Sequence, residues 1–177
     1  MALFALRRPA LSFRHPATLV GTWFGAGLLP LFPGTWGSLA ALPFAWLMLA
    51  FGSPQLLFIA AVLAFLVGWM ATARYLRHSE SKDPPEIVID EVSGQWLALV
   101  FADPGLWWEW LLCFALFRLF DIVKPWPASA IDRQRTALAV MADDSIAALY
   151  ALVVFALVVL LLPAIALLQR SFLGHGG

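Results

Sequence analysis

A long uncharged apolar run near the carboxyl terminus limits the fold more than any other feature of this sequence. Ile146–Leu168 carries no charged side chain. It is long enough to cross a bilayer, which takes about 20 apolar residues in a helix. Of all 177 residues, 62% are hydrophobic and 12% are charged, whereas soluble domains average about 45–50% and about 25%. A chain this short cannot hide the surplus in a core, so the sequence predicts a membrane protein.

Turn-forming and charged stretches divide the rest of the chain into further apolar segments. We expect helices at Leu39–Phe51, Gln55–Ala73, Glu86–Ala102, Leu106–Val123 and Asp144–Leu168. The predicted fold is all-α, a single membrane-embedded domain over residues 1–177 with about four transmembrane helices and short cytoplasmic helices. Residues 18–38 are rich in glycine and proline, and we expect them to form a re-entrant or interfacial segment.

The basic residues indicate the orientation of these helices. Threading the segments alternately through a bilayer puts residues 1–38, 74–90 and 118–144 on one side. That side carries ten of the eleven Lys and Arg residues, and only Arg170 lies opposite. The positive-inside rule identifies it as the cytoplasm. The net charge is zero, which argues against nucleic-acid binding because that needs a basic surplus.

The same threading gathers nine of the eleven acidic residues at or just inside the cytoplasmic face. Several of them interrupt apolar helices, where an ionised group is expensive and needs a partner. Carboxylate oxygens of this kind suit Mg²⁺ or Mn²⁺ better than zinc. We expect the loop residues among them, Glu80, Asp83 and Asp132, to be solvated bystanders. The nine are Glu80, Asp83, Glu86, Asp90, Glu91, Asp121, Asp132, Asp143 and Asp144.

Each of these features also has a purely structural interpretation. Asp143 and Asp144 could cap the start of the last helix instead of binding a ligand. Arg118 and Asp121 are three residues apart and could form an ordinary helical ion pair. The PGTWGS stretch (Pro33–Ser38) could present backbone amides to an anion, or its glycines could serve only close packing. Convergence at one membrane face favours a shared site, and carboxylates beside cationic side chains are typical of a phosphate-ester site.

Missing motifs narrow the reaction mechanism. Cys113 lacks the pattern of a cysteine-nucleophile phosphatase, and no DxDxT stretch for an aspartyl-phosphate route occurs. No signature for a phosphohistidine intermediate and no phosphate-binding loop of the G-x-x-x-x-G-K-[ST] type is present. Attack by a metal-activated water with a carboxylate base remains. A carrier or ion pathway is the non-enzymatic alternative, but it predicts acids spread through the depth of the bilayer.

Four stretches resemble the phosphatidylglycerophosphatase A family. Together with the spans between them they cover nearly the whole chain, in the family's order, so the match is specific. The stretches are LFPGTWGSLAALP (Leu31–Pro43), EIVIDEVSGQWLAL (Glu86–Leu99), FRLFDIVKPWPASAIDR (Phe117–Arg133) and VMADDSIAALYA (Val140–Ala151).

The resemblance implies a Mg²⁺-dependent phosphatase of the bacterial inner membrane that converts phosphatidylglycerol phosphate to phosphatidylglycerol at the cytoplasmic face. The diacyl tail of this phospholipid substrate would stay in the bilayer. The alternative on the same fold is a phosphatase of small soluble phosphate esters. Glu86 lies at a position that varies among relatives, and we expect it to contact the metal ligands without binding the metal itself. The residues implied for catalysis and metal binding are Asp90, Glu91, Asp121 and Asp144, with Asp143 beside them as a metal ligand; those implied for substrate binding are Thr35, Ser38, Arg118 and Lys124.

Overall fold

The structure, a computed structural model, describes residues 6–81 and 83–173, with side chains up to Leu161. Within those ranges the chain forms helices and no strand, which confirms the all-α prediction. The elements are α1 (Pro16–Gly21), the 3-10 helix η2 (Ala26–Leu28), α2 (Pro33–Ala50), α3 (Pro54–Leu76), α4 (Ile89–Ala98), α5 (Trp107–Val123), α6 (Ala128–Asp132) and α7 (Ala137–Leu173).

Local sequence explains where the long helices begin and end. Ser53 caps α3 by accepting a 3.2 Å hydrogen bond from the amide of Leu56, and Pro54 occupies the first helical position, a favourable pairing at a helix start. Thr136 caps α7, because its hydroxyl accepts a 3.1 Å bond from the amide of Ala139. At the end of α5, Lys124 adopts a left-handed conformation with φ of 46°, and Pro125 prevents the helix from continuing.

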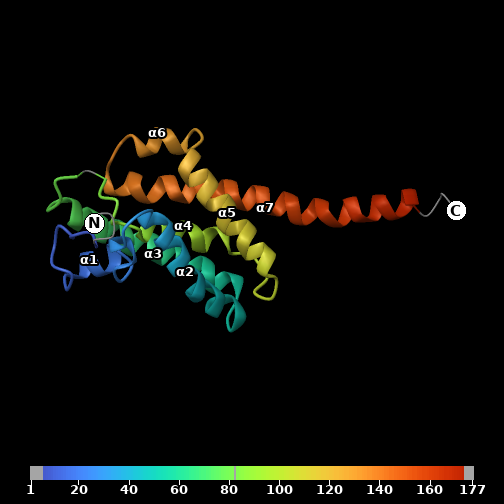
Figure 1. Cartoon of the computed structure of the whole chain (residues 1–177), viewed down its shortest axis with the longest axis horizontal. Helices are drawn as coiled ribbons and strands as arrows, with labels where there is room; N and C mark the ends of the chain where they lie inside the picture. Colours follow the sequence, from blue (N-terminus) through green and yellow to red (C-terminus); the bar gives the residue numbers. More distant parts are fainter. Residues whose placement is uncertain (1–5, 82, 174–177) are drawn as a thin grey trace.

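The short helix α4 occupies the centre of the bundle. It contacts α2, α3, α5 and α7, and Figure 1 shows the long α7 running past the other helices and extending beyond them. Polar side chains of α4 bond to neighbouring backbones: Trp96 donates to the carbonyl of Ala41 at 2.9 Å, and Ser93 to that of Ala61 at 3.2 Å. These bonds satisfy polar groups that are buried inside the bundle. They hold α4, and the acidic residues at its start, in one position.

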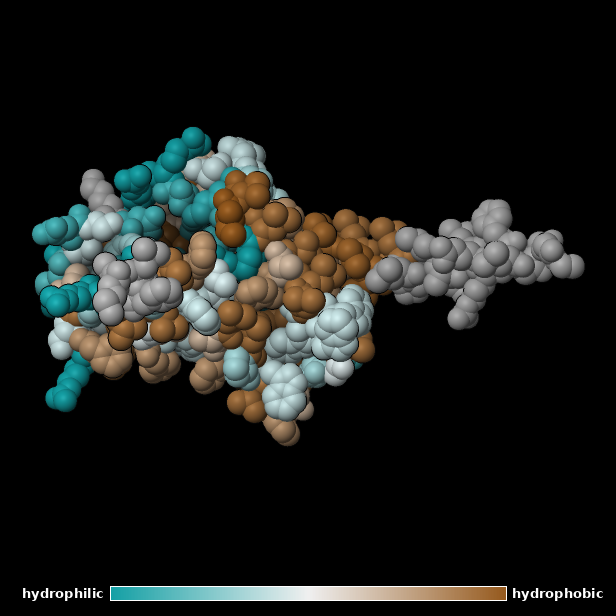
Figure 2. All heavy atoms as spheres, in the orientation of Figure 1, coloured by the Kyte–Doolittle hydropathy of each residue, from teal (hydrophilic) through white to brown (hydrophobic). Residues whose placement is uncertain are grey.

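In the part of the chain that the structure describes, two helices are long and apolar enough to cross a membrane, Pro54–Leu76 and the first part of α7, Ala137–Leu161. Both expose many large apolar side chains, a surface that suits lipid better than water. In Figure 2 hydrophobic residues cover the middle of the molecule and the coloured part of α7 that projects from it, while hydrophilic residues gather at the opposite end. Examples on α3 are Phe58, Ile59, Val62, Leu63, Leu66, Val67, Trp69 and Met70.

Several predicted boundaries differ from the structure. The third predicted helix, Glu86–Ala102, is helical only over Ile89–Ala98, about 15 Å of helix. Residues 18–38 divide among α1, η2 and the first turns of α2. The last helix begins at Ala137 and not at Asp144, because Thr136 provides the cap and nothing between the two positions breaks a helix. The interpretation of Asp143 and Asp144 as a helix-start pair was therefore wrong.

Candidate active site

A cavity of about 410 Å³ opens where α2, α4, α5 and α7 meet. Five acidic residues predicted for the site line it, contributed by three separate helices. Thr35, Arg118 and Lys124 line it as well, so of the predicted site residues only Ser38 is not on its wall. The five acidic residues are Asp90, Glu91, Asp121, Asp143 and Asp144.

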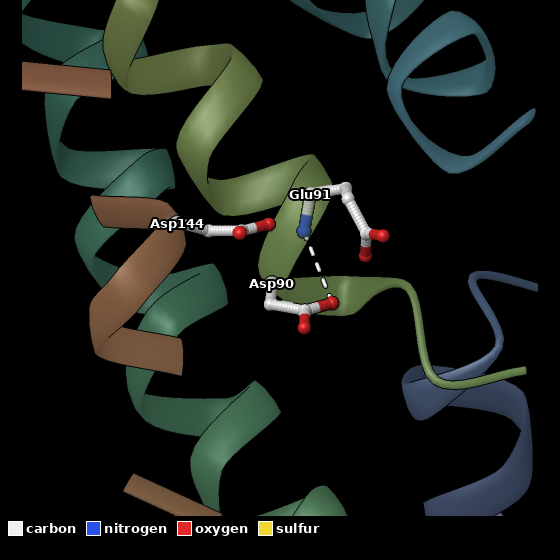
Figure 3. Close-up of side chains that lie close together, drawn as sticks. All are labelled: Asp90, Glu91 and Asp144. Carbon is white, nitrogen blue, oxygen red and sulfur yellow. Dashed lines mark hydrogen bonds between the residues drawn. The ribbon is translucent and has the colours of Figure 1, made fainter. Parts of the chain in front are cut away.

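Asp90, Glu91 and Asp144 form the tightest group in this cavity. One carboxylate oxygen from each lies within 4.8 Å of the other two. Figure 3 shows the two side chains at the start of α4 converging with Asp144 of α7. The amide of Glu91 donates a 3.1 Å hydrogen bond to Asp90 Oδ1. Asp90 and Asp144 are buried, so three acidic groups share a space with little water.

Two glycines make this convergence possible. An ideal β-carbon on Gly34 of α2 would lie 2.1 Å from Glu91 Oε1 and 3.2 Å from Arg118 Nη1. A β-carbon on Gly94 of α4 would lie 2.6 Å from the ring of Phe117 and 3.1 Å from the carbonyl oxygen of Asp144. A side chain at Gly94 would press against the Phe117 ring and the α7 backbone, whereas one at Gly34 would displace the carboxylate of Glu91. The space beside Gly94 is thus filled by its neighbours, not left open beside Asp90.

Arg118 of α5 connects two of the acidic residues. Its Nη1 lies 2.8 Å from Asp121 Oδ2 and 4.0 Å from Glu91 Oε1. The predicted ion pair three residues apart is therefore present, and it lies inside the cavity wall. Nη1 also donates a long 3.4 Å hydrogen bond to Ser38 Oγ. The guanidinium is held between α2, α4 and α5, with one face toward the cavity.

Lys124 is held by two acidic residues from different helices. Its Nζ lies 2.6 Å from Asp132 Oδ1 in α6 and also bonds to Asp143 Oδ2 in α7. Burial lowers the pKa of Lys124, but the two carboxylates outweigh burial and raise it above the ordinary value. Partial burial raises the pKa of Asp132, but the hydrogen bond and charge of Lys124 outweigh it and leave that pKa lowered. Lys124 and Asp132 are both charged at neutral pH.

The neighbouring residues Asp143 and Asp144 thus have separate partners. Successive residues of an α-helix point about 100° apart. Asp143 faces Lys124, and Asp144 faces Asp90 and Glu91.

The PGTWGS stretch forms the first turns of α2. The amides of Thr35 and Trp36 bond to the carbonyl of Phe32, so they do not form an anion-binding loop. Ser38 is fully buried, and its hydroxyl donates a 3.0 Å bond to the carbonyl of Gly34. Close packing therefore accounts for the glycines in this stretch, and Thr35 is its polar side chain on the cavity wall.

Sequence reasoning misplaced some of the other acidic residues. Glu86 precedes α4, and its Oε1 accepts a 2.8 Å hydrogen bond from Tyr75, away from the cavity. Asp132, expected to be a solvated bystander, holds Lys124. Asp83 and Arg135 also line the cavity. Asp132 lies eight residues beyond Lys124, across a turn, so helical spacing could not predict the contact between them. The one indication in the sequence was that both residues belong to the same motif.

The electrostatics of the cavity fit a divalent cation. Seven acidic residues line it against three basic ones, a formal excess of four negative charges. Burial and the nearby Glu91 raise the pKa of Asp90 well above its ordinary value, and burial raises that of Glu91. Among the described residues, Glu91 Oε2 and Asp144 Oδ2 are buried without a hydrogen-bond partner. Buried oxygens left without a partner, in a site that offers only oxygen ligands, could hold a metal ion.

Comparison with known proteins gives matches over most of the chain. The family model described as phosphatidylglycerophosphatase A matches residues 19–159. The phosphatidylglycerophosphatase A of Haemophilus influenzae is 37% identical over 146 residues, 81% of this chain and 89% of that protein. The protein of the same name from Escherichia coli is 38% identical over 144 residues, 77% of this chain and 80% of its own length.

The name of a third relative gives a different substrate. It comes from Bacteroides thetaiotaomicron, is named "Putative phosphatidylinositol-3-phosphatase", and is 36% identical over 144 residues, 78% of this chain and 90% of that protein. No solved structure matches the chain.

Proposed function

This chain belongs to the phosphatidylglycerophosphatase A family, and on that premise we propose that it hydrolyses the terminal phosphate of phosphatidylglycerol phosphate, leaving phosphatidylglycerol. The observation that carries the proposal is the cavity in which acidic residues from three helices meet Arg118 and Lys124. A phosphate monoester needs positive charge to bind and a base to direct water. This cavity combines basic side chains with a group of acidic residues that fits a cation.

In this proposal Asp90, Glu91 and Asp144 would hold a Mg²⁺ ion, while Asp121 and Asp143 would hold the basic side chains Arg118 and Lys124 beside it. When bound, the cation supplies Lewis acidity and the positive charge that offsets the acidic surplus of the cavity. The support is the 4.8 Å grouping of the three side chains and the buried oxygens of Glu91 and Asp144. Asp121 contributes by fixing Arg118, to which it is paired at 2.8 Å.

The protein side chains orient the substrate and move the proton. Arg118 and Lys124 offset the charge of the terminal phosphate, and Thr35 lies at the cavity wall as a hydroxyl donor. Asp90 orients a water molecule and takes its proton as the water oxygen bonds to phosphorus. The bond from phosphorus to the ester oxygen breaks, and that oxygen takes up the proton that Asp90 received, which gives the free hydroxyl of phosphatidylglycerol and restores the Asp90 carboxylate. Inorganic phosphate is the second product.

We propose a multi-pass topology in which α2, α3, α5 and α7 cross the bacterial inner membrane and α4 is a shorter helix buried among them. The Trp46 indole donates a 3.2 Å hydrogen bond to the carbonyl of Pro104, which links the far end of α2 to the turn before α5. The cavity lies at the other end of these helices. Ten of the eleven basic residues belong to segments at the cavity end, so the positive-inside rule supports a cytoplasmic site. The headgroup would enter this site while the acyl chains stay in the bilayer.

The direct test is release of inorganic phosphate by the purified protein in detergent. We expect release from phosphatidylglycerol phosphate with Mg²⁺ and none with excess EDTA. Phosphatidylinositol 3-phosphate and a soluble phosphate ester serve as competing substrates, and a higher kcat/KM for either would reassign the substrate. Flux through proteoliposomes without phosphate release would instead support a carrier.

A further inference from the structure

An apolar groove adjoins the polar cavity at the start of α2. It has a volume of about 430 Å³ and is lined by residues 29–32, which precede α2, and by residues of the first turns of that helix. Phe32 and Thr35 line both the groove and the cavity, so the two spaces share a wall. Thr35 is the one polar residue among those that line the groove, which are Leu29, Pro30, Leu31, Phe32, Thr35, Trp36 and Leu39.

Large apolar side chains of this groove are exposed. Phe32 is 75% exposed and Trp36 43% exposed, and Leu31 and Leu39 are exposed as well. Phe32, Trp36 and Leu39 are spaced by four and three residues, so they lie on one face of the first turns of α2. Lipid or a ligand, not the protein core, is the natural partner of such a face.

The backbone at the junction is held in a costly conformation. Leu31 and Phe32 are consecutive non-glycine residues with φ of 58° and 51°. Bulky side chains rarely adopt this left-handed region, and such strain often occurs at ligand sites. Here it places Phe32 at the boundary between the acidic cavity and the apolar groove.

We propose that this groove binds an acyl chain of the substrate while the terminal phosphate occupies the cavity. The inference rests on the proposed lipid phosphatase function and adds to it the part of the enzyme that recognises a lipid. A phosphate ester with an apolar tail needs a polar site continuous with an apolar one, and Phe32 and Thr35 provide that continuity. The groove positions the lipid and distinguishes it from soluble phosphate esters.

Two variants and one matched control test the groove. Leu39→Trp fills it and Trp36→Ala removes a wall, whereas Trp69→Ala removes a tryptophan of similar exposure, 42% against 43%, from α3 outside the groove. The readout is the ratio of kcat/KM for dioleoyl phosphatidylglycerol phosphate to kcat/KM for its deacylated headgroup. We expect the ratio to fall about tenfold in both groove variants, as for altered hydrophobic pockets, and to stay unchanged in the control.

Unchanged kcat/KM for both substrates in both groove variants would overturn the proposal, because the acyl chain would then lie in bulk lipid or detergent. A loss that is equal for the two substrates would also overturn it, since the groove residues would then act only through the cavity. If the wild-type protein releases phosphate from neither substrate, the proposed function fails. A binding experiment can then still test whether the groove holds an acyl chain. A phosphatidylglycerol phosphate with a photoreactive acyl chain should then label residues 29–39, and labelling confined to other segments would refute the assignment.

Discussion

Glu91 Oε1 occupies the space that a side chain on Gly34 would need, because an ideal β-carbon there would lie 2.1 Å from that oxygen. The absence of a side chain at Gly34 therefore leaves room for the Glu91 carboxylate against the first turn of α2. This position places Glu91 in the group with Asp90 and Asp144.

Gly34→Ala should reduce activity much more than stability. The new methyl group displaces the flexible end of Glu91, and misplacing a catalytic group by about 1 Å costs on the order of 10²-fold in rate. We expect kcat/KM for phosphatidylglycerol phosphate to fall by about that factor, with thermal unfolding in detergent little changed. Gly94→Ala is the contrasting variant, because it meets the Phe117 ring and a backbone carbonyl and should lower stability by about 1–3 kcal/mol. Equal effects of both changes on activity and stability would contradict this prediction.

Neutralising Asp144 should weaken metal binding directly. Asp144→Asn keeps the shape of the side chain but removes one charge from the group of three acidic residues. We expect it to remove the stabilisation of the protein by Mn²⁺ in thermal unfolding, and Asp90→Asn and Glu91→Gln to do the same. Activity should fall by about 10²-fold or more, the scale typical of a lost electrostatic contact. Asp103→Asn, in the turn at the other end of the helices, is the control. If Mn²⁺ stabilised Asp144→Asn as much as the wild-type protein, Asp144 would not be a metal ligand.

The contribution of Lys124 to stability, through its contact with Asp143, should be separable from its contribution to phosphatase activity. Lys124→Met leaves Asp143 buried without a partner, and removing one member of a buried pair is strongly destabilising. Because the Lys124 side chain is 29% exposed, we expect a loss of about 1–3 kcal/mol, less than the roughly 3–5 kcal/mol of a fully buried pair. The double variant Lys124→Met/Asp143→Asn should regain most of this stability without regaining phosphatase activity. Recovery of activity as well would mean that Lys124 acts only by neutralising Asp143.

Asp132 should make the fold sensitive to acid. Its pKa is lowered in the folded protein, since the contact with Lys124 outweighs partial burial. A lowered folded pKa contributes stability that is present above the unfolded pKa, about 3.9, and is lost as the pH falls through the folded value. We expect the wild-type unfolding temperature to drop below about pH 4 more steeply than that of Asp132→Asn, measured in the same detergent. Parallel acid profiles would show that the contact adds nothing to stability.

Particular residues show how far the sequence alone could lead. Apolar segments bounded by Pro54 and by Pro125 predicted α3 and α5 closely, because backbone chemistry limits helices at those positions. The start of α7 was misjudged because hydropathy changes at Asp144 whereas the helix begins at the Thr136 cap. Glu86 and Asp132 were assigned the wrong surroundings for a related reason: both lie outside long helices, and spacing does not predict where a turn directs a side chain.

The sequence by itself determined that this chain forms apolar helices with carboxylates at their ends, because hydrophobicity and charge act locally along the chain. Its four motifs also identified the family. Only the tertiary structure decided which acidic residues meet. Asp143 and Asp144 are neighbours in sequence, yet one holds Lys124 and the other joins Asp90 and Glu91. That division depends on how α4, α5 and α7 pack around Gly34 and Gly94, and packing between helices is set by contacts that no single segment contains.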